Sequence, residues 1–316
     1  MNTLFKHRNF SDFFTDTIAF FKENWNIFFR NYLIINGAFL MTLMILIYIV
    51  TKVFFESLFG SINNPKQASI FSDLMQDNAL LFVAITVVFI LIIILISVLS
   101  YAYPIIYMDL HEKNRGYKIS TSQIIQELKK NAGRLFMFFL GSLFVVLPLA
   151  IIIFGICALL CFILIGFPML FIFGPTFISW YCICFFDYLT NKVSFFESLS
   201  SGYKLVKSQF WAIVGGTFLA VMVVQILQSI VVMVPYLGGL AYFFASTEEF
   251  NGLQSTESFS FMTILVAVVF ILSLLISYLL NNFLIVSQGM MYYSARELTE
   301  NKQANSQIDN IGSDFE

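Results

Sequence analysis

The sequence predicts an all-α membrane protein, a polytopic bundle of six transmembrane helices. Hydrophobic residues make up 59% of the 316-residue chain and charged residues only 11%, whereas a soluble domain is about one quarter charged. A helix needs about 20 largely apolar residues to cross hydrocarbon. Six stretches meet this requirement, at residues 32–53, 79–110, 135–157, 161–188, 210–234 and 262–292. None alternates as an outer-membrane β-strand does, so helices are expected to satisfy the backbone.

The Lys and Arg residues are spread unevenly over the connections between these stretches. Of the 17, 15 precede the first stretch, lie between the second and third or the fourth and fifth, or follow the sixth. Only Lys52 and Lys66 fall on the other side. Because short loops rich in Lys and Arg stay in the cytoplasm, both termini are predicted to be cytoplasmic. The charges scattered through the N-terminal segment indicate mature protein rather than a signal peptide.

The segment KVSFFESLSSGYKLVKSQFW, residues 192–211, predicts an amphipathic helix that leads into the fifth stretch. Ser194 and Glu197 have the spacing of a capping box, in which each side chain bonds the backbone amide of the other residue. The apolar residues that follow recur at helical spacings of three and four: Phe196, Leu199, Tyr203, Val206 and Phe210.

The same arrangement precedes the first and third stretches. The pairs Asn9 with Asp12 and Ser120 with Gln123 align with Ser194 and Glu197. We therefore predict one membrane domain over residues 1–300, built from three repeats at about 9–114, 120–191 and 194–301. Each repeat would consist of an interfacial amphipathic helix followed by a helical hairpin. Residues 301–316 are predicted to be a disordered cytoplasmic tail.

Basic side chains accompany each predicted interfacial helix. A lysine near anionic headgroups contributes about 1 kcal/mol to membrane binding, so anionic membrane lipid is the expected partner. The residues expected to bind lipid or a partner protein are Lys22, Lys129, Lys130, Arg134, Lys204 and Lys207. An open alternative is that these helices pack on one another below the bundle and touch little lipid.

Uncharged polar residues mark the fifth and sixth stretches. Gln225 and Gln228 lie three apart, and Asn281 and Asn282 are adjacent. Hydrogen bonds between amides of neighbouring helices contribute about 0.6 to 2 kcal/mol, which favours a role in holding the bundle together. The alternative is a polar seam between the two helices that a lipid or small apolar solute would use.

The residue pattern gives no indication of an enzyme. No ionisable residue lies near the middle of any stretch, although such residues usually mark intramembrane chemistry. Phosphate loops, nucleophile elbows and the H-E-x-x-H pattern do not occur. The four cysteines, Cys157, Cys161, Cys182 and Cys184, have no His or acid beside them within the bilayer, so free thiols are expected and not a metal site. No cofactor and no nucleic-acid partner are expected.

The segment SFFESLSSGYKLVKSQFWAIVG resembles the YciC-like group of bacterial six-helix membrane proteins and the membrane domain attached to some glycerophosphoryl diester phosphodiesterases. The resemblance implies a multi-pass protein of the bacterial cytoplasmic (inner) membrane. In the phosphodiesterases the chemistry belongs to a soluble barrel, which this sequence lacks, so the resemblance does not imply that activity.

Two functions follow as hypotheses. The first is a non-enzymatic inner-membrane scaffold, whose basic interfacial helices bind anionic lipid, a partner protein or a second copy of the chain. The alternative is a carrier of a lipid or small apolar solute through the seam of the fifth and sixth helices.

Overall fold

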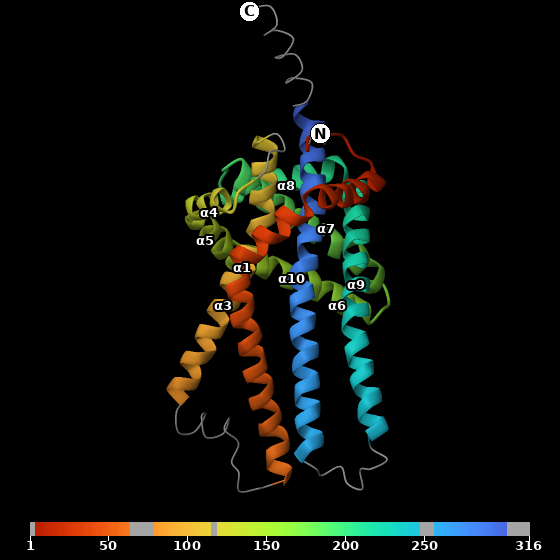
Figure 1. Cartoon of the computed structure of the whole chain (residues 1–316). Coiled ribbons are helices and arrows are strands. Elements are labelled where there is room, and N and C mark those ends of the chain that lie inside the picture. The colour runs from red at the N-terminus through yellow and green to blue at the C-terminus, as the bar shows by residue number, and fades with distance from the viewer. Residues whose placement is uncertain (1–3, 64–78, 115–118, 247–255, 302–316) are drawn as a thin grey trace, which may run out of the picture. The chain divides into compact units, whose positions relative to one another are not determined.

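The computed structural model describes residues 4–63, 79–114, 119–246 and 256–301, and the regular structure in these ranges is entirely helical (Figure 1). The elements are α1 (Phe10–Asn63), α3 (Ala79–Lys113), α4 (Thr121–Lys130), α5 (Ala132–Gly141), a short π-helix η1 (Ser142–Val146), α6 (Leu147–Cys161), α7 (Gly166–Thr190), α8 (Phe195–Ser208), α9 (Phe210–Ser246) and α10 (Thr256–Glu300). The tail predicted to be disordered lies, beyond Asn301, outside the described residues.

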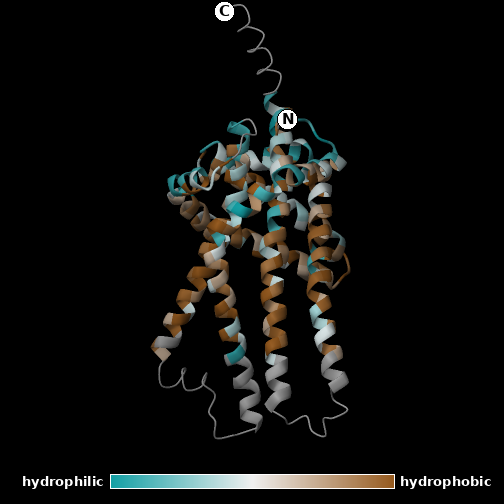
Figure 2. Cartoon of the chain, viewed as in Figure 1, coloured by the Kyte–Doolittle hydropathy of each residue, from teal (hydrophilic) through white to brown (hydrophobic). Residues whose placement is uncertain are grey.

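The predicted all-α membrane fold is confirmed. Within the described ranges, six helical segments are long and apolar enough to cross a membrane: Phe10–Lys52, Val83–Lys113, Ala132–Cys161, Gly166–Thr190, Phe210–Ala241 and Thr263–Glu300. Figure 2 shows hydrophobic residues along most of their length. Many of these side chains are exposed, as expected of helices whose surroundings are lipid rather than water.

The described chain forms two compact units. Unit 1 contains Met1–Ile35, Ser100–Val224 and Asn281–Glu316, and unit 2 contains Asn36–Leu99 and Gln225–Leu280. The predicted interfacial helices and the whole of α4 to α8 therefore belong to unit 1.

Unit 2 consists of the remaining parts of α1, α3, α9 and α10, and sparse polar contacts join these helices. The hydroxyl groups of Ser97 on α3 and Tyr278 on α10 lie 3.4 Å apart. Gly239 on α9 leaves room for the side chain of Leu265 on α10, which a Cβ atom at position 239 would overlap. Small residues at such positions allow helices to pack closely in a membrane, where lipid competes equally well for apolar surface.

The helix starts follow the predicted capping chemistry. In α4 and α8, Ser120 with Gln123 and Ser194 with Glu197 form complete capping boxes. At the start of α1, the backbone amide of Asn9 donates to Oδ2 of Asp12 at 2.9 Å. These bonds satisfy amide groups that have no partner inside the helix, which explains why the helices begin where they do.

An aromatic core joins α1 to α3 within unit 1. The ring of Phe28 lies 5.1 Å from that of Tyr103 and 4.9 Å from that of Tyr107. The Tyr103 hydroxyl donates to the backbone carbonyl of Phe28 at 2.6 Å, and the Tyr32 hydroxyl donates to Ser100 Oγ at 3.2 Å. Edge-to-face rings contribute beyond their buried area, and the hydrogen bonds satisfy the buried hydroxyls.

A buried arginine fixes the segment before α1. The Arg8 side chain is 1% exposed, and its Nε lies 2.8 Å from Oδ2 of Asp16. Its backbone amide donates to Ser294 Oγ on α10 at 3.0 Å. Burial lowers the pKa of the Arg8 guanidinium from its ordinary value, and Asp16 opposes this shift. The N-terminal segment is thus held both to α1 and to the end of α10.

Helices α7 and α8 approach each other closely at Gly202. A Cβ atom there would overlap Cys184 Sγ and lie 3.2 Å from the backbone nitrogen of Cys184 and 3.3 Å from its Cα. Backbone atoms cannot move aside as a flexible side chain can. The absence of a side chain at position 202 is therefore what lets α8 lie against α7.

We expect Gly202→Leu to destabilise unit 1 by about 1 to 3 kcal/mol, the usual effect of forcing extra carbons into a packed contact. The thermal unfolding midpoint of the detergent-solubilised protein would fall relative to the wild type. Ser200→Leu on the exposed side of α8 is the control and should leave the midpoint nearly unchanged. Equal midpoints for the two variants would contradict this account of the α7–α8 contact.

Candidate functional site

Helix α8 turns one face toward the protein and another outward. Its buried residues are Ser198, Gly202, Leu205 and Val206. Phe196 and Tyr203, on the opposite side, are 70% and 62% exposed. The predicted apolar stripe is therefore divided between the two faces, since Val206 is buried while Phe196 and Tyr203 are not. The reason is steric, because Ser198 and Gly202 permit a close approach to α7 that large rings would prevent.

Two lysines share the outward side of α8. Lys207 lies four residues after Tyr203, one helical turn away on the same face, and Lys204 lies beside it. Both are exposed, and neither forms an ion pair with any other residue in the described ranges. Aromatic rings combined with lysines are typical of helices that lie in a membrane interface. We call Phe196, Tyr203, Lys204 and Lys207 the interface face of α8.

Similar outward faces occur on the helical segments that precede the first and third membrane spans. On α4 and α5 the exposed side chains include Ile125, Lys129 and Phe136. On α1 they include Lys22 and Trp25. Each face therefore combines at least one lysine with a large apolar side chain, as the interface face of α8 does.

Lys130 is exposed as well, but it has a partner. Its Nζ lies 3.3 Å from Oε1 of Glu127, one turn earlier on α4. An exposed pair of this kind contributes little to stability, but it offsets the charge that Lys130 would present to anionic lipid.

The buried positions of the three helix starts share one register. In each of the three segments, the residues four, eight and eleven positions after the capping residue are buried. They are Phe13, Thr17 and Phe20 in α1; Ile124, Leu128 and Asn131 from α4 onward; and Ser198, Gly202 and Leu205 in α8. The shared register is what the repeat predicts, although the side chains differ, and the repeat itself stays a prediction.

Arg134 differs from the other predicted basic residues. One of its terminal nitrogens donates to the backbone carbonyls of Tyr188 at 2.5 Å and Val193 at 2.7 Å. Its guanidinium also lies over the Tyr188 ring, 4.1 Å from the centroid. Arg134 therefore clamps α5 to the end of α7. The sequence could not reveal this, because the two carbonyls lie 54 and 59 residues away along the chain.

A buried polar junction connects the end of α7 to α10. Oδ1 of Asp187 accepts from Asn191 Nδ2 at 2.5 Å and from the Tyr292 hydroxyl at 3.2 Å. Arg296 donates to Asn191 Oδ1 at 2.8 Å and pairs with Glu300 at 2.6 Å. Asp187 is only 2% exposed. The neutral donors Asn191 and Tyr292 satisfy this buried carboxylate.

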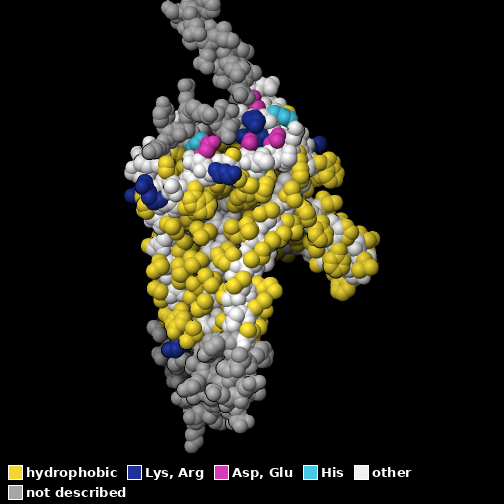
Figure 3. All heavy atoms as spheres, turned by 45° about the vertical axis from the view of Figure 1, so that its right-hand side comes forward, with side chains coloured by type: hydrophobic (Ala, Val, Ile, Leu, Met, Phe, Trp, Pro, Cys, Tyr) yellow, Lys and Arg dark blue, Asp and Glu magenta, His cyan; other side chains and the backbone are white. Residues whose placement is uncertain are grey.

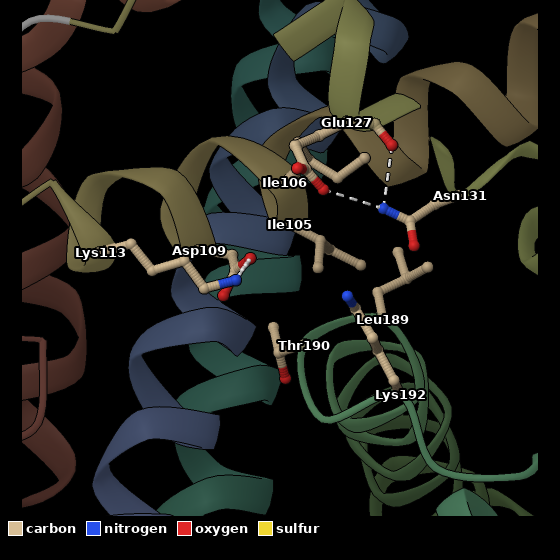
Figure 4. Close-up of a pocket in the computed structure, with 9 residues that line it drawn as sticks. All are labelled: Ile105, Ile106, Asp109, Lys113, Glu127, Asn131, Leu189, Thr190 and Lys192. Carbon is tan, nitrogen blue, oxygen red and sulfur yellow. Dashed lines mark hydrogen bonds and ion pairs between the residues drawn. The ribbon is translucent and has the colours of Figure 1, made fainter. Parts of the chain in front are cut away.

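Beside this junction is a small cavity in unit 1, between the ends of α3, α4 and α7 (Figure 4). Its charged lining consists of Asp109, Lys113, Glu127 and Lys192. Lys113 Nζ lies 2.5 Å from Oδ2 of Asp109, and Asn131 donates to Oε2 of Glu127 at 3.3 Å. The volume of about 10 Å³ leaves room for about one water molecule, which is too small for a lipid headgroup.

The residues of the predicted solute seam fall into different units. Gln225 is exposed in unit 2, where Gln228 Nε2 donates to Ser273 Oγ at 3.5 Å. Asn281 and Asn282 belong to unit 1, and Asn282 is 1% exposed. Within unit 2, Gln228 thus joins α9 to α10, as the predicted role in holding the bundle together requires.

A second polar chain, which the sequence analysis did not predict, joins α7, α9 and α10 inside unit 1. The hydroxyls of Ser179 and Thr217 lie 2.6 Å apart, and Gln288 Nε2 donates to Thr217 Oγ1 at 2.8 Å. All three side chains are fully buried. Isolated Ser and Thr residues are common in membrane helices. This hydrogen-bonded group can therefore be identified only from the positions of its residues in space.

The four cysteines are free thiols in this structure. Cys157, Cys182 and Cys184 are buried, and Cys161 is partly exposed. Among the described residues, no three His, Cys, Asp or Glu side chains are grouped so that they could hold a metal ion.

Comparisons with known proteins add no family to this description. No family model matches the chain, and no curated protein or solved structure matches it either. The residues and their geometry therefore carry the functional argument.

Substitution of Arg134 tests whether this residue holds α5 to the end of α7 while Lys129 remains an exposed charge. Arg134→Gln removes the charged donor for the carbonyls of Tyr188 and Val193, and hydrogen bonds to charged groups contribute about 1.5 to 3 kcal/mol each. We expect a clearly lower thermal unfolding midpoint in detergent. Lys129→Gln removes the same charge from an exposed position and should change stability by no more than about 0.5 kcal/mol. Equal loss in both variants would show that Arg134 is not a structural clamp.

Proposed function

We propose that this integral membrane protein is a non-enzymatic scaffold that gathers anionic lipid along its basic interfacial helices, in the cytoplasmic membrane of a bacterium. The observation that carries the proposal is the interface face of α8. There, Phe196 and Tyr203 are exposed next to two lysines that form no ion pair within the described ranges.

The exposed rings support contact with lipid rather than with the rest of unit 1. The inner face of α8 is already occupied, because Ser198, Gly202 and Leu205 are buried there. Tyrosine is amphipathic at the interface, where its ring leaves water while its hydroxyl stays near the headgroups, and phenylalanine adds a fully apolar ring. Phe196 and Tyr203 would anchor α8 at that depth.

The lysines supply the charge preference. Side chains of this length extend to the headgroup level while their methylene groups cover apolar surface. At about 1 kcal/mol per lysine near an anionic surface, Lys204 and Lys207 together would favour anionic over neutral lipid by up to about thirtyfold. This attraction should weaken as the ionic strength rises.

Charge neutralisation tests the proposal. We expect Lys204→Gln combined with Lys207→Gln to lower the preference for phosphatidylglycerol over phosphatidylcholine several-fold. The measurement is the fraction of motionally restricted spin-labelled lipid around the reconstituted protein, at low and at high salt.

The matched control is Lys113→Gln combined with Lys130→Gln, which removes the same charge. These lysines are already paired with Asp109 and Glu127, so lipid preference should change much less. An equal loss in both variants would indicate a general effect of net charge, and no loss in either would refute the lipid proposal. If a copurifying protein is lost from the Lys204 and Lys207 variant while lipid preference is unchanged, the lysines bind a protein partner instead.

The carrier alternative has weaker support. Gln225 is exposed, and the Gln228 amide already bonds Ser273. Within unit 2 these contacts favour helix packing over a solute path.

A further inference from the structure

The turn between α6 and α7 consists only of apolar residues. It comprises Phe162, Ile163, Leu164 and Ile165, all of them exposed, with Phe162 at 86% and Leu164 at 72%. No charged residue occurs from position 135 to position 186. The other two predicted outer connections contain charged residues such as Lys66 and Glu248. This turn therefore lacks the polar residues that a connection in water would be expected to carry.

Three of the four backbone amides in the turn have partners within the hairpin. The amides of Phe162, Ile163 and Leu164 donate to the carbonyls three residues earlier, at 3.3, 3.2 and 3.0 Å. Hydrocarbon contains no water to replace such bonds, so a turn within it must make them internally. A turn in water has no such requirement.

One residue of the turn is apolar although its conformation favours other types. Leu164 has a φ angle of 64°, in the left-handed region where glycine or asparagine is usual. Leucine at this position keeps the tip apolar despite the steric strain. The conformation and the composition thus favour surroundings of hydrocarbon over surroundings of water.

The direction of the hairpin agrees with this. Within unit 1, α6 runs across the direction of the C-terminal part of α10 instead of beside it (Figure 1). In Figure 3 the hairpin extends away from the rest of unit 1 and carries hydrophobic side chains over its surface. Exposed residues on α6 include the neighbours Ile151 and Ile152 and the later Ile156 and Leu159, so more than one side of the helix is open to its surroundings.

We propose that α6 and α7 form a re-entrant hairpin, which enters and leaves the bilayer on the side of α4 and α8. Its turn lies within the hydrocarbon and contacts lipid acyl chains, so it does not reach water on the far side. Four of the six apolar segments then cross the membrane, and the position of both termini on one side is unchanged. The proposal does not depend on the lipid preference of the interface face.

A single cysteine at the tip tests the proposal. In a variant with Cys157, Cys161, Cys182 and Cys184 replaced by alanine, Ile163→Cys is labelled with bimane and reconstituted with lipids brominated at different depths. We expect the strongest quenching from bromines in the terminal half of the acyl chains and little quenching by aqueous iodide. Ile165→Cys, also exposed, serves if the first variant does not fold, as judged by its thermal unfolding midpoint.

Other outcomes would overturn the proposal. Strong quenching by iodide and by bromines near the headgroups would place the turn at a membrane surface, as in a hairpin that crosses fully or lies along the interface. Quenching by neither would show that protein, such as a second copy of the chain, covers the tip. Ser200→Cys on the exposed side of α8 is the control for a position at the interface and should respond to iodide.

Discussion

The absence of water from the bilayer core is the constraint on which this structure depends. Every backbone amide and carbonyl there needs a partner within the protein, and helices provide these partners without help from neighbouring segments. In the proposed re-entrant hairpin, the same requirement extends to the turn after α6, where the amides of Phe162, Ile163 and Leu164 bond carbonyls three residues earlier. It also accounts for the neutral donors around Asp187, since a buried carboxylate without partners would be very costly.

Polar contacts and close approaches near the helix ends determine which helices of unit 1 pack against one another. Apolar helices in lipid have little reason to prefer one another over acyl chains, so small residues and hydrogen bonds must select the contacts. Gly202 lets α8 lie against α7, Arg134 clamps α5 to the carbonyls beyond α7, and Arg8 ties the N-terminal segment to α10 through Ser294. The close approach at Gly202 fixes which face of α8 is buried. It thereby leaves Phe196 and Tyr203 outside, next to Lys204 and Lys207.

The two proposals describe neighbouring parts of the chain. Helix α4 precedes the α6–α7 hairpin and α8 follows it directly. In the proposed arrangement, helices at the interface flank a hairpin that enters and leaves the bilayer on the same side. The protein would then contact headgroups and acyl chains through a continuous segment of about 90 residues, 121–208, which supports a role in organising lipid.

The sequence by itself determined the all-α membrane class, the six apolar segments and the capping of α4 and α8, because hydrophobic length and local hydrogen bonding depend on neighbouring residues. It also identified the lysines at the helix starts. Only the tertiary structure decided which of the basic residues stay exposed and which face of α8 is buried. Arg134 illustrates the difference, because its partners lie more than 50 residues away. Tyr203 and Val206 appeared equivalent in the apolar pattern, but the close approach of α7 at Gly202 buries one and exposes the other. Such choices depend on the shape of a distant helix, which local periodicity does not encode.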